Sequence, residues 1–331
     1  MNGNILEVEN LKKYFDQKKG FSLFPGRRQF IKAVDGVSFI VKEKEIFALV
    51  GETGCGKTTI GRLIVRLEDP TEGKIRFKNE DISNLKGKKI KEFRKDVQMI
   101  FQDPYASLNP RMTVSQTVIE PLRNYGLAKD SEETAKRIIK SLTDAGLSPV
   151  EEYIERFPHE LSGGEKQRVS IARALILEPS FMVADEPVSM LDVSIRTGVM
   201  KLMLELREKY GLAYLLITHD ISVARYMSDK IGVMYLGILV ESSDTESIIK
   251  KALHPYTRAL IKAVPIADPK RERIPLPIKG EIPSLVERPS GCVFRTRCLY
   301  AVSICEEKMP SLIENENNHF VACHRVEKGE I

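Results

Sequence analysis

The chain has 331 residues, of which 42% are hydrophobic and 29% charged; this is ordinary for a globular protein and excludes the disordered and fibrous classes. Its net charge of +5 is small and its lysines and arginines are spread over many segments, so the charge gives no argument for a nucleic-acid partner. In chain order, the apolar runs IFALV, FMVA and YLLIT end at Gly51, Asp185 and His219. Such unbroken runs predict strands buried on both faces, in a largely parallel sheet covered by helices.

Between the first two of these strands, from about Lys86 to Glu178, the pattern becomes mainly helical, most clearly in AKRIIKSLTDAGL, residues 135–147. We therefore expect a helical subdomain, about residues 86–178, inserted into an α/β domain that spans residues 1–254. From Pro255 to Pro289, seven prolines disfavour long helices and central strands. Residues 255–331 are expected to form an extended connector and a small cysteine-bearing extension.

Two features bear on location. The longest nearly uncharged apolar stretch, residues 231–240 (IGVMYLGILV), has about half of the ~20 residues that a membrane-spanning helix needs. The first residues, MNGNILEVENLKKYF, lack a cationic segment followed by an apolar run. We expect a chain that does not cross a membrane by itself and that stays in the cytoplasm.

The stretch GETGCGKTT, residues 51–59, fits the phosphate-loop pattern G-x-x-x-x-G-K-[ST] and lies between a predicted strand and a predicted helix. Its glycines let backbone N–H groups turn toward phosphates, Lys57 reaches the β and γ phosphates, and Thr58 offers a hydroxyl to Mg²⁺. The alternative is a plain glycine-rich turn before a helix, which the complete motif in this setting disfavours. Cys55 is interpreted as a space-filling residue, not a nucleophile. The predicted nucleotide-binding residues of the loop are Gly51, Glu52, Thr53, Gly54, Cys55, Gly56, Lys57, Thr58 and Thr59.

Two carboxylates end the FMVADE run. The first, Asp185, is placed to bind Mg²⁺ through water, and the second, Glu186, to polarise a water aligned with the γ phosphate. His219, at the end of the next predicted strand, could hold that phosphate and the attacking water. Each residue alone has a structural alternative, but together with the phosphate loop they indicate nucleotide hydrolysis.

A second glycine-rich element, LSGGEKQR, starts at Leu161. Ser162 and Glu165 have the spacing of a capping box at the start of a helix. A glycine-led helix start is also an anion site. The chain already has one phosphate loop, so this second site fits a phosphate that arrives from another subunit.

Six ordered motifs, GETGCGKTT, Gln102 in MIFQDP, LSGGEKQR, VADEP, SMLD and THD, resemble the nucleotide-binding subunit of ATP-binding cassette (ABC) transporters over about residues 5–250. The resemblance implies a P-loop NTPase core with an antiparallel β subdomain and an inserted helical subdomain. It further implies a head-to-tail dimer with two ATP molecules, each held by one subunit's phosphate loop and the other's LSGGE motif.

The resemblance also assigns roles to single residues. An aromatic ring stacks on adenine, either Phe15 or Tyr14, and Gln102 joins the Mg²⁺ site to the helical subdomain. Mg²⁺ is then bound through Thr58, Gln102 and Asp185. The catalytic residues are Glu186, His219, Lys57 and Gln102, and the residues acting in trans are Ser162, Gly163, Gly164, Glu165 and Asp192. Thr53, Thr58, Glu165 and Met190 depart mildly from the usual motifs, and none of these changes removes a group needed for hydrolysis.

The C-terminal stretches LHPYTRALIKAVP, GEIPS and GCVFRTRC are similar to the C-terminal region of dipeptide and oligopeptide importer subunits, a group that includes nickel and oligosaccharide importers. The segment DQKKGFSLFPGRRQFIK, residues 16–32, resembles the second, F-type, ATPase subunit of such importers. Its basic residues either contact a membrane surface or a partner, or form a solvated hairpin.

The implied partners are a related D-type ATPase subunit or a second copy, two membrane-spanning permease subunits and, indirectly, an extracytoplasmic solute-binding protein. The implied location is the cytoplasmic face of the cell membrane.

The extension carries Cys292, Cys298, Cys305 and Cys323, with 5, 6 and 17 residues between them. In a reducing compartment this cluster favours a metal or free thiols over disulfides. The spacing lacks the C-x-x-C pairs of common zinc sites and leaves a [4Fe–4S] cluster, zinc and free thiols open; the resemblance suggests the iron–sulfur cluster. The nearby Arg295, Arg297 and His324 could stabilise its negative charge or keep the extension soluble.

The motifs disfavour several other classes of ATPase and kinase. DNA-repair and chromosome ATPases need long insertions, the translation-factor branch needs two cassettes, and a small-molecule P-loop kinase leaves LSGGE unexplained. An ABC-type ATPase that is not coupled to transport remains an alternative, as does a redox- or iron-responsive role for the cysteines.

Overall fold

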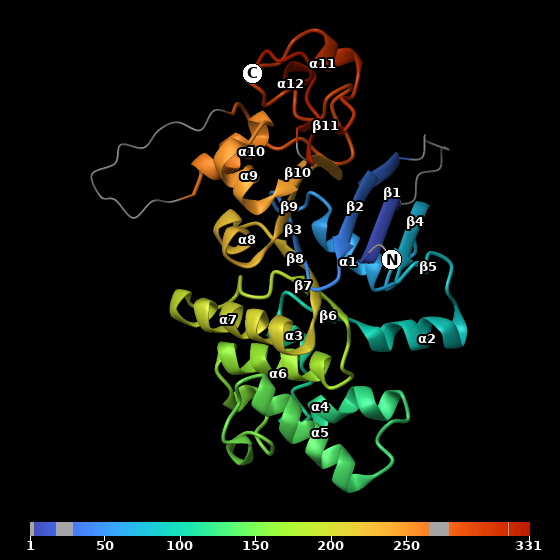
Figure 1. Cartoon of the computed structure of the whole chain (residues 1–331), viewed down its shortest axis with the longest axis vertical. Coiled ribbons are helices and arrows are strands. Elements are labelled where there is room, and N and C mark those ends of the chain that lie inside the picture. Colours follow the sequence, from blue (N-terminus) through green and yellow to red (C-terminus); the bar gives the residue numbers. More distant parts are fainter. Residues whose placement is uncertain (1–2, 18–28, 265–277, 317) are drawn as a thin grey trace, which may run out of the picture. The chain divides into compact units, whose positions relative to one another are not determined.

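The structure, a computed structural model, describes residues 3–17, 29–264, 278–316 and 318–331 (Figure 1). Most of the basic segment of residues 16–32 and the middle of the proline-rich connector therefore lie outside the described residues. The chain forms two compact units. Among the described residues, the helical unit consists of residues 3–5, 41–46 and 84–217, and the sheet unit consists of residues 6–17, 29–40, 47–83, 218–264, 278–316 and 318–331. Each unit is described by itself.

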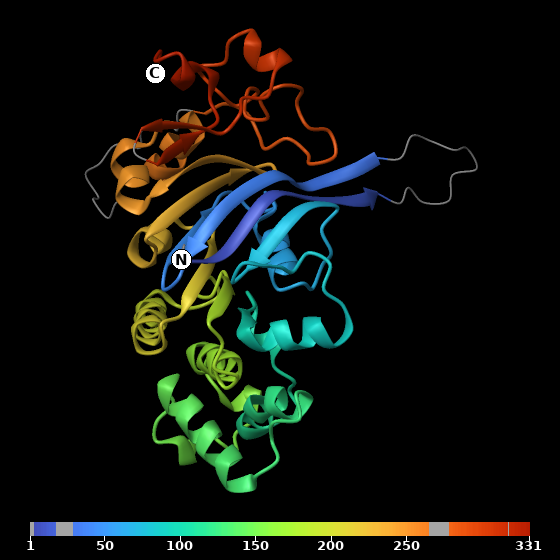
Figure 2. The same ribbon diagram turned by 45° about the vertical axis from the view of Figure 1, so that its right-hand side comes forward.

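The sheet unit contains an antiparallel sheet in the order β2-β1-β4-β5, in which β1 pairs with β4 and β4 with β5. Figure 2 shows β1 and β2 as two long strands side by side. The unit also holds the strands β11-β12-β10-β9-β3, in which β3 and β9 are parallel and the other pairs antiparallel. The strands are β1 Asn4–Gln17, β2 Gln29–Lys42, β3 Ile46–Val50, β4 Glu72–Phe77, β5 Glu80–Asp81, β9 Lys230–Tyr235, β10 Ile238–Asp244, β11 Ile313–Glu316 and β12 His319–Val321.

Short helices complete this unit: α1 Lys57–Ile64, α8 Ile221–Met227, α9 Thr245–Lys251, α10 Pro255–Lys262, α11 Ile304–Glu307 and α12 His324–Glu327. The apolar run of residues 231–240 is a hairpin of β9 and β10 that turns at Leu236 and Gly237, both with positive φ. Helix α10 begins the proline-rich stretch with Pro255 at its first position, where proline is tolerated because that N–H has no partner within the helix.

The helical unit has three parallel strands in the order β8-β7-β6: β6 Val97–Ile100, β7 Phe181–Asp185 and β8 Ala213–Thr218. The helices are α2 Gly87–Asp96, α3 Pro104–Ser107, α4 Val114–Asn124, α5 Ser131–Asp144, α6 Gly163–Leu175 and α7 Val193–Tyr210, with 3-10 turns at Val150–Glu152 and Pro158–Glu160. The three strands predicted from unbroken apolar runs are confirmed as β3, β7 and β8, and every residue in them is buried.

The predicted helix at residues 135–147 is confirmed as α5, with different ends. It begins at Ser131 because Asp130 accepts hydrogen bonds from the N–H groups of Glu132 and Glu133. It ends at Asp144 because Gly146 takes a positive φ of 73° and closes the last turn. Within the part of the chain that the structure describes, every helix is too short or too polar to span a bilayer.

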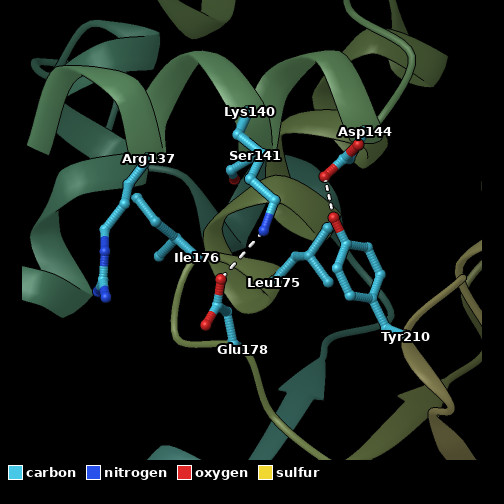
Figure 3. A pocket seen from close by; sticks show the side chains of 8 residues that line it. All are labelled: Arg137, Lys140, Ser141, Asp144, Leu175, Ile176, Glu178 and Tyr210. Carbon is cyan, nitrogen blue, oxygen red and sulfur yellow. Dashed lines mark hydrogen bonds and ion pairs between the residues drawn. The ribbon is translucent and has the colours of Figure 1, made fainter. Parts of the chain in front are cut away.

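Figure 3 shows how the end of α5 is fastened to the rest of the helical unit. The Tyr210 hydroxyl, at the end of α7, donates to Asp144, which also pairs with Lys209 at 2.5 Å. Lys140 of α5 pairs at 3.1 Å with Glu178, which follows the end of α6. These contacts join the C-terminal part of α5 to the end of α7 and to the segment that follows α6.

We predict that Tyr210→Phe lowers the free energy of unfolding by about 1 kcal/mol, because it removes the hydroxyl donor from the partly buried Asp144 carboxylate. Urea denaturation of the full chain measures the change. The matched control is Tyr226→Phe, at a side chain that is 52% exposed, where little change is expected. Equal effects of the two substitutions would contradict the assigned role of the Tyr210 hydroxyl.

Candidate nucleotide-binding site

The phosphate loop follows the buried strand β3 and ends at α1, as predicted. A Cβ added to Gly51 would overlap the Met234 carbonyl oxygen, and one added to Gly56 would overlap the Ala33 carbonyl oxygen. Gly56 also has a φ of 106°, which L side chains rarely adopt. The loop therefore needs glycine at both positions to lie against β9 and β2.

The loop lysine is buried. Lys57 Nζ donates to the carbonyl oxygens of Gly51 at 2.7 Å and Glu52 at 3.0 Å. The Cys55 thiol lies 3.7 Å from this ammonium group, and burial raises the pKa of Cys55. A raised pKa disfavours the thiolate, in keeping with the space-filling interpretation of Cys55. Thr58 and Thr59, the next residues of α1, are half-buried.

Both candidate adenine-stacking rings lie near the end of β1 and are half-buried. The Tyr14 hydroxyl donates to Asp35, and burial together with this bond raises the pKa of Tyr14. The Lys13 ammonium lies 4.9 Å from the Phe15 ring centre, and that of Lys32 lies 5.2 Å from the Tyr14 ring centre. Each ring thus has a cation over one face, and the choice between Phe15 and Tyr14 stays a prediction.

In the helical unit, Asp185 ends β7 and is 3% exposed, and Glu186 follows at 9% exposed. Glu186 has a φ of 45°, and its N–H donates to the Ile217 carbonyl of the neighbouring strand at 2.8 Å. Gln102 Nε2, just after β6, donates to Glu186 Oε2 at 2.9 Å. The structure thus brings together the predicted glutamine and the predicted general base.

The capping box predicted in LSGGEKQR is confirmed. Ser162 Oγ accepts from the Glu165 N–H at 3.3 Å, and Glu165 Oε2 accepts from the Ser162 N–H at 2.7 Å. Burial raises the pKa of Glu165, but the hydrogen bonds from Ser162 outweigh it and leave that pKa below its usual value. The carboxylate therefore stays charged at the start of α6, where the helix dipole favours it.

A Cβ on Gly164 would lie 2.5 Å from Ile195 Cγ2, whereas one on Gly163 would lie at ordinary distances of 3.4 Å from Tyr105 Oη and 3.5 Å from Leu191 Cδ2. The turn that carries Asp192 thus packs beside the start of α6. Asp192 is exposed at the N-cap position of α7, where its side chain makes no capping hydrogen bond. The nearby Met190 and Val193 are 57% and 77% exposed.

In the sheet unit, His219 is exposed just after β8. Helix α8 begins two residues later, with Asp220 Oδ1 accepting from the Ser222 N–H at 2.8 Å. The phosphate loop, Phe15, Tyr14 and His219 therefore belong to the sheet unit. The helical unit carries Gln102, the two carboxylates, the LSGGE start of α6 and Asp192.

Comparisons with known proteins agree with this set of motifs. A family profile described as ABC transporter matches residues 34–189, and one described as oligopeptide/dipeptide transporter, C-terminal region, matches residues 240–305. The oligopeptide transport ATP-binding protein AppF of Bacillus subtilis (strain 168) is 49% identical over 325 residues, 97% of each chain. The oligopeptide transport ATP-binding protein OppF of Salmonella typhimurium is 45% identical over 326 residues, 98% of this chain and 96% of its own. The chain belongs to the ABC transporter family.

Among solved structures, the ATP-binding cassette MJ0796, in a dimeric post-hydrolysis state bound to ADP and Pi, aligns with a TM-score of 0.64 at 30% identity. The alignment covers 72% of this chain and 98% of MJ0796. The predicted fold class, a P-loop ABC ATPase core with an antiparallel β subdomain and a helical subdomain, is confirmed, and the chain is an ATPase of this family.

The extension of this ABC ATPase gathers its four predicted cysteines around one pocket, which His254, Phe294 and Tyr300 also line. All four are free thiols. Burial raises the pKa of Cys292 to about 12 and lowers that of His254 to about 4, so the uncharged form of each is favoured at neutral pH. Within the described residues, His, Cys, Asp and Glu side chains form no group of three placed to hold a single metal ion.

The structure also places functional groups that the sequence did not predict. Arg297 and Tyr256, from the C-terminal region of the ABC ATPase, reach Glu52 of the phosphate loop. The sequence interpretation linked Arg297 to the cysteine cluster, whereas its guanidinium pairs with a carboxylate 245 residues earlier in the chain. Arg295 and His324 do line the cysteine pocket.

We predict that Gly164→Ala destabilises the chain by about 1–3 kcal/mol, because the new methyl group would overlap Ile195 Cγ2. Gly163→Ala is the matched control, since its methyl group meets only ordinary contacts. The measurement is the free energy of unfolding in urea. Adding Ile195→Ala to Gly164→Ala removes the obstructing carbon and should recover part of the loss; no recovery would contradict the packing explanation.

Proposed function

We propose that this ABC ATPase is the subunit that powers import of dipeptides or oligopeptides through a membrane transporter. The observation that carries the proposal is the match of residues 240–305 to the oligopeptide/dipeptide transporter C-terminal region, in a chain that also holds the complete ATPase motifs. The names of AppF and OppF, both similar over nearly the whole chain, support peptide over nickel or oligosaccharide cargo. They also favour a role in transport over a free-standing ATPase.

In this proposal, the phosphate loop surrounds the ATP phosphates with backbone N–H groups and directs Lys57 at the β and γ phosphates. The close approach of Gly51 and Gly56 to neighbouring carbonyls fits such a cradle, because side chains there would displace its backbone. Thr58, Gln102 and Asp185 would hold Mg²⁺, whose charge would offset that of the phosphates. Either Phe15 or Tyr14 stacks on the adenine.

Glu186 acts as the base that polarises the attacking water, and His219 holds the γ phosphate and that water. The hydrogen bond from Gln102 orients the Glu186 carboxylate, with Oε2 as its acceptor. Burial of Glu186 supports the role, since a carboxylate shielded from solvent water exerts a stronger effect on one aligned water. Because Gln102 touches both the Mg²⁺ site and Glu186 in this proposal, it joins the ATP site to the helical subdomain, about residues 86–178.

We assign the LSGGE start of α6 to a nucleotide held by a second ATPase subunit, either a related D-type chain or another copy. Ser162, Gly163, Gly164 and Glu165 then meet the partner's ATP, and Asp192 communicates across the interface. The exposure of Met190 and Val193 beside this helix start supports a subunit contact there, since large apolar side chains favour burial. The dimeric state of MJ0796 supports the same arrangement.

Two permease subunits are the proposed membrane partners, with an extracytoplasmic solute-binding protein acting through them, and the chain is placed at the cytoplasmic face of the membrane. Phe101 and Tyr105, on either side of Gln102, are 42% and 56% exposed. Two exposed aromatic rings beside the residue that touches the catalytic glutamate suit a permease helix that senses the ATP site. Nucleic acid has no place in this function.

We propose a [4Fe–4S] cluster at Cys292, Cys298, Cys305 and Cys323. The four thiols line one pocket, and Cys298 Sγ accepts from the Tyr300 N–H at 3.3 Å, the kind of bond that stabilises cluster sulfurs. Bound iron would supply the positive charge that buried thiolates require. A single zinc ion needs all four sulfurs within about 2.3 Å of one point, whereas in a cluster each thiolate binds a different iron. Zinc held by the same four thiols is the alternative.

We predict that Glu186→Gln retains ATP binding, lowers turnover by at least about 100-fold and accumulates closed dimers, because it removes the base and keeps the shape. The measurements are ATPase rates and ATP-driven uptake of a labelled tripeptide by proteoliposomes that contain the native transporter complex. The control Glu178→Gln, at a carboxylate paired with Lys140 on the surface, should behave as wild type. Wild-type turnover by Glu186→Gln would refute the assigned base, and uptake of nickel or an oligosaccharide in place of peptide would refute the cargo.

We predict that protein purified without oxygen contains about four iron atoms and four sulfides per chain. Cys298→Ser and Cys323→Ser should each lower that content sharply, whereas Cys55→Ser, in the phosphate loop, should not. Metal and sulfide analysis with visible absorption measures both. About one zinc per chain and little iron would contradict the cluster, and so would four unmodified thiols without metal.

A further inference from the structure

The phosphate loop carries a carboxylate, Glu52, immediately after its first glycine. In the sheet unit this carboxylate is paired with Arg297 from the cysteine-bearing extension. Arg297 Nη1 donates to Glu52 Oε2 at 2.6 Å, and Nη2 donates to Oε1 at 3.0 Å. Two parallel hydrogen bonds of this kind strengthen the ion pair and fix the orientation of the two side chains. The Arg297 side chain is only 6% exposed and that of Glu52 is 24% exposed, so the arginine side of the pair is shielded from water.

The backbone around Arg297 is itself held in place. The Arg297 N–H donates to the Phe294 carbonyl at 3.0 Å, and the Arg297 carbonyl accepts from the Lys279 N–H at 2.9 Å. The next residue, Cys298, forms an antiparallel bridge with Ile278. The guanidinium carbon lies 5.8 Å from the centre of the Tyr235 ring. The fork of donors therefore reaches Glu52 from a fixed position.

The backbone of Glu52 is engaged as well. Its N–H donates to the Tyr256 hydroxyl of α10 at 3.0 Å, and its carbonyl oxygen accepts from Lys57 Nζ at 3.0 Å. Arg297 and Tyr256, both from the C-terminal region, thus hold the side chain and the N–H group of Glu52. The carbonyl oxygen of Glu52 in turn accepts from Lys57. A shift of Glu52 would move a hydrogen-bond acceptor of Lys57.

We propose that Arg297 is a positioning residue for ATP binding: it neutralises Glu52 and holds it so that the loop and Lys57 receive the triphosphate. The inference rests on the proposed function, in which residues 51–59 bind ATP. An unpaired carboxylate inside that loop would repel a ligand that carries several negative charges of its own. The ion pair of Arg297 and Glu52 has no net charge, so it removes this repulsion.

The test uses the full-length chain and Mg-ATP, with equilibrium binding followed by a fluorescent ATP analogue and turnover by phosphate release. Arg297→Gln should raise the Kd and the KM for ATP by about tenfold or more, with a much smaller change in kcat, because the repulsion acts when the phosphates bind. The double variant Glu52→Gln/Arg297→Gln removes both charges and should lower the Kd at least about threefold below that of Arg297→Gln. A merely structural role for Arg297 predicts no such recovery.

The control is Arg76→Gln, which removes an arginine paired with Glu7 and Glu9 on the antiparallel sheet of the same unit. Its ATP affinity should equal that of wild type. A wild-type Kd for Arg297→Gln, or a double variant as weak as Arg297→Gln, would overturn the inference. If Arg297→Gln does not fold, Arg297→Lys takes its place: it keeps the charge but not the fork, its Kd should rise at least about threefold, and an unchanged Kd overturns the inference.

Lys57→Ala separates this inference from the proposed function. If Lys57→Ala binds ATP as tightly as wild type, residues 51–59 are not the ATP-binding loop. Loss of affinity in Lys57→Ala together with wild-type affinity in Arg297→Gln would contradict only the role of Arg297.

Discussion

The close approach of the phosphate loop to the segments behind it is the constraint on which the site depends. Gly51 and Gly56 lie against the carbonyls of Met234 and Ala33 so tightly that no side chain fits. The same region is tied by backbone hydrogen bonds of 2.8 Å from the Gly237 N–H to the Cys55 carbonyl and of 2.9 Å from the Asp35 N–H to the Gly237 carbonyl. Two stretches, residues 33–35 and 234–237, therefore shape the loop, and its backbone donors are held before any ligand arrives.

The features that the sequence predicted well depend on residues close together in the chain. Buried strands require unbroken apolar runs, and β3, β7 and β8 lie where those runs occur. The capping box at Ser162 needs only two side chains three positions apart. The end of α5 was less well predicted because the apolar pattern continues to Leu147, whereas the backbone turns at Gly146.

The features that it did not predict join distant residues. Gln102 and Glu186 were both predicted as catalytic residues, but the hydrogen bond between them, across 84 positions, was not predicted. The pair of Glu52 and Arg297 spans 245 positions. Spacing cannot reveal such pairs, because each depends on how whole elements pack. Arg297 lies next to Cys298 in the sequence, which suggested a role at the cysteines. In the structure Cys298 lines the cysteine pocket, whereas Arg297 reaches Glu52. Adjacent residues of an irregular segment need not serve the same site.

The two glycines of the LSGGE motif differ in whether folding of the chain requires them. Gly164 has a reason within its own subunit, since Ile195 occupies the space that a side chain would need. Gly163 has no comparable obstruction, because an added Cβ would meet only ordinary contacts. Folding of the described chain therefore does not explain a glycine at position 163. A bare backbone at the first turn of α6 is explained if a charged group approaches from outside, since helix N-termini bind anions best where no side chain intervenes. This contrast favours a nucleotide held by a partner subunit over a purely structural role for the motif.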